Sequence, residues 1–244
     1  MLRSTTPSTL INDSSRPLVF LGSNSNLYQY IEICQLIGID IAGIMDSDYY
    51  GNTDYYCEIP VIDTEESLYN SEKLKMYQEK YNFFCATNWS PERDADIIRN
   101  KEKRHKLIDL IDQFDLRCIS LVGLVNFISP SVKIGKGVFI DSMVHVGPKA
   151  SIGDFVNIQA MTCVGPNAKI GRNCTLQRLC CISDVVVGEN SYFAPMTKAL
   201  KNKAVFGANT FIHEGIYIKR GTVDNEIVAM DQGNRHRVMP YVSV

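Results

Sequence analysis

ISPSVK-IGKGVF-IDSMVH-VGPKAS-IGDFVN-IQAMTC-VGPNAK-IGRNCT-LQRLCC, residues 128–181, is a sequence that repeats every six residues. Each of its nine hexads begins with Ile, Val or Leu, and the fifth place holds only Val, Ala, Thr or Cys. A fixed short period dictates the architecture of a chain. A period of six fits neither a helix nor an alternating strand, and it predicts a parallel β-helix with three sides of six residues in each coil.

The hexad places have different roles in such a coil. The first residue is expected to point inward and stack on its counterpart one coil away, and the fifth to point inward near a corner, where only a small side chain fits. Glycine follows the first residue in five hexads, where the chain bends: Gly135, Gly147, Gly153, Gly165 and Gly171. The pattern resembles the hexapeptide-repeat, left-handed β-helix superfamily. With less regular hexads up to Val223, it predicts about five coils.

Composition excludes several classes of protein. With 244 residues the chain suits one or two domains, and its net charge of −2 gives no electrostatic attraction to nucleic acid. No apolar run approaches the ~20 residues of a membrane span, and no signal peptide opens the chain, so a cytoplasmic protein is expected. The eight Cys form no CxxC pair, and Cys174 and Cys180 take the small inward place of the coil. We interpret them as reduced packing residues.

Strand and helix patterns alternate before the repeat. Buried strand patterns at 16–22, 39–46 and 82–88 are separated by helical patterns, which predicts a small parallel sheet with crossover helices, a Rossmann-like α/β domain. The expected domains are a flexible tail over residues 1–15, the α/β domain over 16–122, the all-β left-handed β-helix over 123–223 and a C-terminal extension over 224–244.

The ends of the α/β strands suggest a ligand site. A strand that ends in a glycine turn and enters a helix can present backbone N–H groups to a phosphate, and an acidic side chain at the next strand end can meet a ribose or a sugar. The alternative is a plain tight turn, since GxGxxG is absent. The candidate substrate-binding residues are Gly22, Ser23, Asn24, Ser25, Asp46 and Thr87.

The order of the two domains, together with VFLGSNSN, GIMDSD and NFISPSVKIGKGVFI, resembles the bacterial nucleotide-sugar N-acetyltransferases of the bacillosamine and sialic acid O-acetyltransferase type. The resemblance covers Arg16 to Thr222. It implies that the N-terminal domain holds the nucleotide sugar, that the coils form a homotrimer, and that acetyl-CoA lies along the groove between neighbouring coils. Ser23–Asn26 replaces the glycine-rich, often His-containing loop of that family.

The position of the family's catalytic base is altered in this sequence. In the family, a His followed by an acidic residue at a coil corner accepts a proton from the attacking amine or hydroxyl. Pro166 and Asn167 stand there, and Thr175 replaces a second His that is expected near the acyl-CoA. The hexads run without a gap from Ile134 to Ile170, so no shift of the alignment restores the base.

Two of the four His are catalytic candidates. His145 takes the sixth place of its hexad and His213 the second place of IHEGIY, beside Glu214, so both are expected to project outward. His145 lies about one coil from the altered corner, and His213 is too far away to act there within one chain, although a subunit interface can relocate either residue. The alternative for each is a surface or interface His. His105 and His236 are expected at the surface.

The last coils carry candidate partners for coenzyme A. Acetyl-CoA is the expected acyl donor, and no metal is expected. Basic side chains suit the coenzyme phosphates, and a solvated rim is the alternative. The candidate cofactor-binding residues are Gly207, Ala208, Lys219 and Arg220, with further lysines at Lys198, Lys201 and Lys203.

Other functions of a β-helix can be weighed. A γ-type carbonic anhydrase needs three closely placed His around zinc, which His145 and His213 do not provide, and a nucleotidyltransferase needs a basic glycine-rich loop. Two hypotheses remain. The first is an acyl-CoA-dependent N- or O-acetyltransferase that acts on a nucleotide-linked amino sugar in surface glycan biosynthesis. The second is a sugar-nucleotide-binding or structural trimer that has lost catalysis, as Pro166 suggests.

Overall fold

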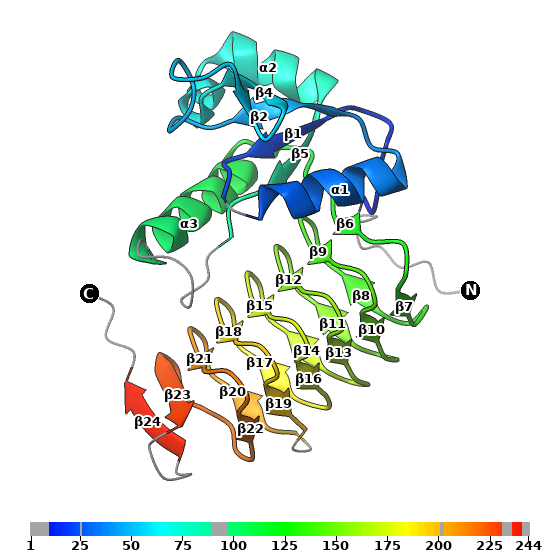
Figure 1. Ribbon diagram of the computed structural model, residues 1–244, viewed down its shortest axis with the longest axis vertical. Helices are drawn as coiled ribbons and strands as arrows, with labels where there is room; N and C mark the ends of the chain where they lie inside the picture. Colours follow the sequence, from blue (N-terminus) through cyan, green and yellow to red (C-terminus); the bar gives the residue numbers. More distant parts are fainter. Residues whose placement is uncertain (1–9, 25, 89–96, 201–202, 231–235, 241–244) are drawn as a thin grey trace. The chain divides into compact units, whose positions relative to one another are not determined.

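The computed structural model describes residues 10–24, 26–88, 97–200, 203–230 and 236–240. The chain divides into two compact units, residues 1–121 and 122–244 (Figure 1). The first unit mixes helices with a sheet, and the second is a parallel β-helix. The Rossmann-like α/β class and the left-handed β-helix predicted from the sequence are both confirmed.

The first unit is built on a five-stranded sheet of order β3-β4-β2-β1-β5. β1, β2, β4 and β5 are parallel, and the short β3 forms an antiparallel hairpin with β4. β1 is buried along its whole length, which is typical of a parallel strand covered on both faces. The strands are β1 (Leu18–Leu21), β2 (Ile41–Met45), β3 (Tyr55–Tyr56), β4 (Ile59–Asp63) and β5 (Asn82–Cys85).

α1 (Leu27–Ile37) connects β1 to β2, the 3₁₀ helix η1 (Glu65–Tyr69) and α2 (Ser71–Lys80) connect β4 to β5, and α3 (Ile97–Gln113) follows β5. α1 ends at Gly38, whose φ of 72° is left-handed and favours glycine. Asn70 caps the N-terminus of α2, and its side chain accepts hydrogen bonds from the backbone N–H groups of Glu72 and Lys73. α2 has no clear signal in the sequence, because Tyr77 is the one residue of this helix that is buried.

The residues just before β1 are held to the first unit. Of the range 1–15, which we expect to be a flexible tail, the structure describes residues 10–15, and these make contacts with distant residues of the first unit. The backbone N–H of Asn12 donates to the carbonyl oxygen of Ser120 at 2.9 Å, and Ile11 forms a β-bridge with Ser120. Asp13 forms an ion pair with Arg117, 2.7 Å between Oδ2 and Nη2. These partners lie more than a hundred residues away, so no local pattern reveals them.

The ion pair of Asp13 makes the free energy of unfolding depend on pH. Burial opposes ionisation, but hydrogen bonds from Arg117 and Ser15 outweigh it and lower the pKa of Asp13 from 3.8 to about 2. A lowered pKa stabilises the fold above pH 3.8, and the contribution disappears as the pH falls through about 2. We therefore expect Asp13→Asn to lower the free energy of unfolding by ~1–2 kcal/mol at neutral pH. Urea unfolding of both proteins should show this difference shrinking at acid pH. The exposed Asp40→Asn is the control, and a difference that persists at pH ~2 would contradict the assignment.

The second unit stacks two-residue strands into a three-sided coil (Figure 1). We name its three sheets after one outward residue each: the His145 face, the Lys169 face and the Tyr192 face. The His145 face holds β7 (Phe127–Ile128), β10 (His145–Val146), β13 (Cys163–Val164), β16 (Cys181–Ile182), β19 (Lys198–Ala199) and β22 (Tyr217–Ile218). The Lys169 face holds β8 (Lys133–Ile134), β11 (Ser151–Ile152), β14 (Lys169–Ile170), β17 (Val186–Val187) and β20 (Val205–Phe206).

The Tyr192 face extends beyond the sequence repeat. It holds β6 (Leu121–Val122), β9 (Phe139–Ile140), β12 (Asn157–Ile158), β15 (Thr175–Leu176), β18 (Tyr192–Phe193), β21 (Phe211–Ile212), β23 (Glu226–Met230) and β24 (His236–Pro240). β23 pairs in parallel with β21 although the hexads stop at Val223, and β24 pairs antiparallel with β23. Backbone pairing does not require the side-chain period, so residues 224–244 include two further strands of this sheet.

The core of the coil follows the hexad places. First-place residues such as Ile140, Val146 and Ile158 are fully buried and stack between coils, as predicted. The fifth-place residues from Val138 to Cys180 are also buried, and the thiols of Cys174 and Cys180 lie 3.1 and 3.2 Å from backbone carbonyl oxygens. All eight cysteines lie in described ranges and are free thiols. The hexads that are one residue short or long differ in length at the corners of the coil, because the strands stay in register on each face.

Candidate functional site

The first candidate site lies at the carboxyl ends of the strands in the first unit. The chain leaves β1 on one side toward β2 and returns on the other side to β5, and such a switch in strand order forms a crevice for ligands. The turns after β1 and β5 meet there. Gly22 has a φ of 69°, and a Cβ on it would lie 2.3 Å from Oγ1 of Thr87, so glycine alone fits.

A network of charged side chains surrounds Asp46 at this edge. Asp46 is fully buried, and its carboxylate accepts hydrogen bonds from Oγ of Ser23 at 2.6 Å and from Nζ of Lys103 at 2.7 Å. Lys103 also donates to Asp48 at 2.7 Å. Burial lowers the pKa of Lys103, but the two carboxylates outweigh it and raise the pKa, so the ammonium stays charged.

Further polar contacts join the turns after β1 and β5. The amide of Asn24 donates to the carbonyl oxygen of Asn88 at 2.7 Å, and the buried guanidinium of Arg104 donates to the carbonyl oxygen of Thr87. Ser25 lies outside the described residues. The structure therefore brings together Gly22, Ser23, Asn24, Asp46 and Thr87 from the sequence prediction.

Two basic residues of this network, Lys103 and Arg104, were not predicted from the sequence. Both lie on α3, within a run of charges that is typical of a solvated helix. Lys103 is 57 residues from Asp46 in the chain, so their spacing carries no signal. A lysine has three donors, and two of those on Lys103 bind carboxylates. The third can meet a phosphate oxygen.

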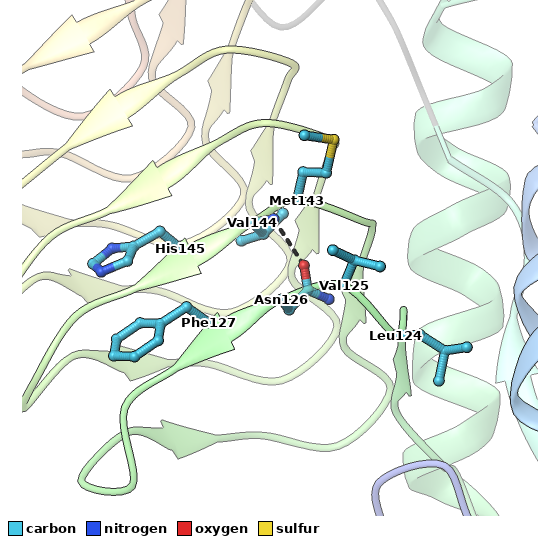
Figure 2. Close-up of a pocket in the computed structure, with 7 residues that line it drawn as sticks. All are labelled: Leu124, Val125, Asn126, Phe127, Met143, Val144 and His145. Atoms are coloured by element: carbon cyan, nitrogen blue, oxygen red, sulfur yellow. Dashed lines mark hydrogen bonds between the residues drawn. The ribbon is translucent and has the colours of Figure 1, made fainter.

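The second candidate site surrounds His145 on the outer surface of the coil. The imidazole is exposed and stacks on the ring of Phe127, with centroids 5.0 Å apart and an angle of 7° between the rings. Its Nδ1 lies 3.7 Å from Sγ of Cys163 on the next coil. His145 lines an open cavity of about 550 Å³ with six other residues, which Figure 2 shows: Leu124, Val125, Asn126, Phe127, Met143 and Val144.

The cavity wall is largely apolar, and a stacked ring pair and a hydrogen bond between coils hold its residues in position. Figure 2 shows the imidazole of His145 beside the ring of Phe127, and Oδ1 of Asn126 accepting a hydrogen bond from the backbone N–H of Val144. That hydrogen bond is 2.7 Å long and joins two successive coils. An imidazole in such a place can take a proton from a group that reacts beside it.

The altered corner offers no base of its own. Pro166 and Asn167 are exposed at the corner that follows β13, and Asn167 has a left-handed φ of 59°. Thr175 lies on β15, which belongs to the Tyr192 face, and is buried. Neither corner residue has a side chain that titrates near neutral pH.

His213 lies apart from His145. It follows β21 at the corner between the Tyr192 and His145 faces, and its ring packs edge-on against Phe211 at 4.7 Å. Burial lowers the pKa of His213, although Glu214 raises it. It is three coils beyond Gln159, which is about 14 Å at the spacing of adjacent strands. The structure does not bring the two candidates together within one chain.

Three of the predicted cofactor-binding groups have partners within the coil. The backbone N–H of Gly207 donates to the carbonyl oxygen of Thr222 at 3.1 Å, and that of Ala208 donates to the carboxylate of Asp224 at 2.8 Å. Arg220 donates to Glu226 at 2.8 Å.

Lysines at the same end of the coil are more accessible. Nζ of Lys219 lies 5.7 Å from the ring centroid of Tyr217. Lys198 is exposed and in register with Tyr217 on the His145 face. Lys203 is exposed, and Lys201 lies outside the described residues.

One corner of the coil carries an exposed apolar row. Met143, Met161, Leu179 and Met196 take the fourth hexad place between the Tyr192 and His145 faces and are each at least half exposed. We call them the methionine ridge. All four have a φ near +60°, which is costly for a residue with a side chain. At the corner after the His145 face, the same place holds Lys149, Asn167, Asp184 and Lys203.

Comparison with known proteins identifies the fold. Among solved structures that match is a mutant of GDP-perosamine N-acetyltransferase from Caulobacter crescentus in complex with CoA and GDP-perosamine. It has a TM-score of 0.73 and 21% identity, over 92% of this chain and 97% of that chain. The acetyltransferase domain of PglB from Neisseria gonorrhoeae FA1090 has a TM-score of 0.75 and 17% identity, over 92% and 100%. WeeI from Acinetobacter baumannii AYE has a TM-score of 0.63 and 12% identity, over 92% and 100%.

These comparisons confirm the resemblance in fold to hexapeptide-repeat sugar acetyltransferases. No family model matches the sequence, and no curated protein matches it either. Within the described ranges, no helix has the length and apolar character needed to cross a membrane. The same ranges contain no cluster of three or more His, Cys, Asp or Glu arranged to hold a metal ion.

Proposed function

We propose that this chain, which has the fold of hexapeptide-repeat sugar acetyltransferases, is an acyl-CoA-dependent acyltransferase that acts on a nucleotide-linked amino sugar in surface glycan biosynthesis. The observation that carries the proposal is the match of 92% of the chain to a structure that holds both CoA and GDP-perosamine. The charged network around Asp46 and the cavity beside His145 support it, since the reaction needs a site for a nucleotide and a base beside a groove.

The crevice of the first unit suits the nucleotide. Lys103 presents an ammonium that two carboxylates hold in place, at the edge where the turn after β1 contacts Asp46 through Ser23. A diphosphate can accept hydrogen bonds from such a lysine and from backbone N–H groups. Asp46, buried beneath it, keeps the lysine charged and oriented.

Replacing Lys103 should weaken nucleotide binding. Lys103→Met removes the charge but keeps the length of the side chain, and we expect the Kd for UDP, GDP or dTDP to rise at least ~10-fold, which corresponds to about 1.4 kcal/mol. Isothermal titration calorimetry measures the affinity. Lys106→Met is the matched control, since Lys106 lies on the same helix as Lys103 and forms an exposed ion pair with Glu66 of η1. Equal affinities of both variants and the wild type would remove Lys103 from the site.

The His145 face suits the acyl donor. His145 is the proposed base, in place of the His that is absent at Pro166. From His145 to Tyr217 the face spans four coil steps, or about 19 Å, which is long enough for an extended coenzyme. Lys198 and Lys219 flank Tyr217 at the far end and can pair with coenzyme phosphates.

The methionine ridge supports a homotrimer. A left-handed conformation costs free energy in any residue with a side chain. A methionine at a solvent-exposed corner also places apolar surface in water, which an asparagine or lysine there would not do. Burial of the ridge against another copy would offset this strain by removing apolar surface from water. The ridge borders the cavity at Met143, so such an interface would place the partner's surface beside His145. His213 stays a second candidate base, because it lies at the same corner.

A thiol-release assay tests the proposed function. Acetyl-CoA is incubated with a panel of UDP-, GDP- and dTDP-linked amino sugars, and free CoA is followed with a chromogenic thiol reagent. Turnover with one of the sugars supports the acyltransferase. Nucleotide binding without turnover on any sugar would favour the alternative, a sugar-nucleotide-binding trimer that has lost catalysis at Pro166.

A further inference from the structure

We propose that Cys163 is a nucleophile that carries the acyl group between CoA and the sugar, with His145 as its base. The inference rests on the proposed function and deepens it, since it names a covalent route through side chains of this chain. It follows from a Cys–His pair on the outer surface of the coil.

The pair is built by the register of the His145 face. β10 and β13 are adjacent parallel strands, and His145 lies opposite Cys163. Sγ of Cys163 and Nδ1 of His145 are 3.7 Å apart, within reach of a hydrogen bond to sulfur. The stacked ring of Phe127 holds the imidazole from the other side. A nucleophile in contact with a base that a third group orients is the arrangement that nucleophilic catalysis requires.

The pair also lies close to the altered corner. Cys163 precedes Pro166 by three residues, on the strand that leads into that corner, and it is half-buried rather than sealed in the core. Cys174 and Cys180, by contrast, are fully enclosed and bond to backbone carbonyl oxygens. The structure therefore provides a thiol and a base where the side chain of Pro166 provides neither.

The transfer takes place in two balanced steps. In the first, Nδ1 of His145 accepts the thiol proton of Cys163, the sulfur attacks the thioester carbonyl carbon, and the bond from that carbon to the coenzyme sulfur breaks. The coenzyme thiolate takes the proton from His145 and leaves as CoA. In the second, the amine of the sugar attacks the acyl-Cys163 carbonyl, His145 accepts the amine proton, and Cys163 leaves and recovers a proton from His145. The first step exchanges one thioester for another and needs no co-reactant.

The environment of Cys163 explains why it needs His145. Burial and the neighbouring Cys181 raise the pKa of the Cys163 thiol, so little thiolate forms without a base. Cys181 lies opposite Cys163 on the adjacent coil, and it is therefore one coil further from His145. It is a matched control, since it has the same chemistry, hexad place and face.

Intact-protein mass spectrometry and steady-state kinetics test the proposal. Wild type and Cys181→Ser mixed with acetyl-CoA alone should each gain one acyl group, labile to hydroxylamine and mapped to Cys163, and release one equivalent of CoA. Cys163→Ser should gain none and lose turnover on the order of 10²-fold, with an unchanged circular dichroism spectrum. Double-reciprocal plots of rate against acetyl-CoA concentration, at several fixed sugar concentrations, should show the parallel lines of a ping-pong mechanism.

The outcomes that overturn the inference differ from those that overturn the proposed function. Turnover with intersecting lines and no acyl adduct in the wild type, or an adduct on Cys181, would exclude the relay and leave a direct acyltransferase. Normal turnover by Cys163→Ser would do the same. Absence of both an adduct and thiol release with every sugar would refute the proposed function itself.

Discussion

Replacing His145 with alanine should lower kcat/KM for acyl transfer by 10²–10⁴-fold, the range that a positioned general base contributes. The imidazole is the titratable group of the cavity on the His145 face, and it contacts Cys163. Whether the thiol or the sugar amine is the first group to lose its proton, the proton has to reach this ring. The measurement is the thiol-release rate with the sugar that the panel identifies.

The controls separate loss of the base from loss of the fold. Lys169→Ala removes an exposed side chain from the same hexad place on another face, and its rate should match that of the wild type. Nucleotide affinity should stay unchanged in His145→Ala, because the crevice belongs to the other unit. If His145→Ala turns over normally while His213→Ala loses activity, the base is His213.

Replacing Met161 with lysine should abolish the homotrimer that we propose. Met161 is in the middle of the methionine ridge and is 53% exposed, so a charge there would be buried in the interface without a partner, at a cost of several kcal/mol per subunit. Light scattering after gel filtration should show trimers for the wild type and monomers for the variant. Turnover should fall in parallel, since the cavity beside His145 then lacks its partner surface.

The substitution itself is compatible with the coil. Lys149 and Lys203 already occupy the fourth hexad place in the same left-handed conformation at another corner. Val205→Lys is the control. Val205 is 58% exposed on the Lys169 face, so this substitution should leave the assembly unchanged. A wild-type protein that runs as a monomer, or a Met161→Lys variant that stays trimeric, would show that the ridge is not the interface.

Part of the candidate site was visible in the sequence. Gly22, Ser23, Asn24, Asp46 and Thr87 were predicted there, chiefly because a glycine turn between a strand and a helix suits a phosphate and an acidic strand end suits a sugar. The pairing of His145 with Cys163 also had a signal that we did not use: the two residues are three hexads apart, and three hexads make one coil. The same spacing places Met143, Met161 and Leu179 in one row.

Other features had no signal in the sequence. Lys103 and Asp13 bind carboxylate or guanidinium partners that are far along the chain, and α2 buries too little to show a helical period. β23 joins the coil through its backbone alone, after the hexads have ended. Such contacts depend on where the packed elements meet, and local periodicity does not report on that.

The sequence by itself determined the architecture, because a period of six with apolar first and small fifth places predicts a three-sided coil, and because alternating strands and helices predict a parallel sheet. It also determined that Pro166 cannot act as a base. The tertiary structure decided which charged groups surround Asp46 and which guanidinium pairs with Asp13. These depend on distances between side chains from separate elements, and those distances are set when the whole chain packs.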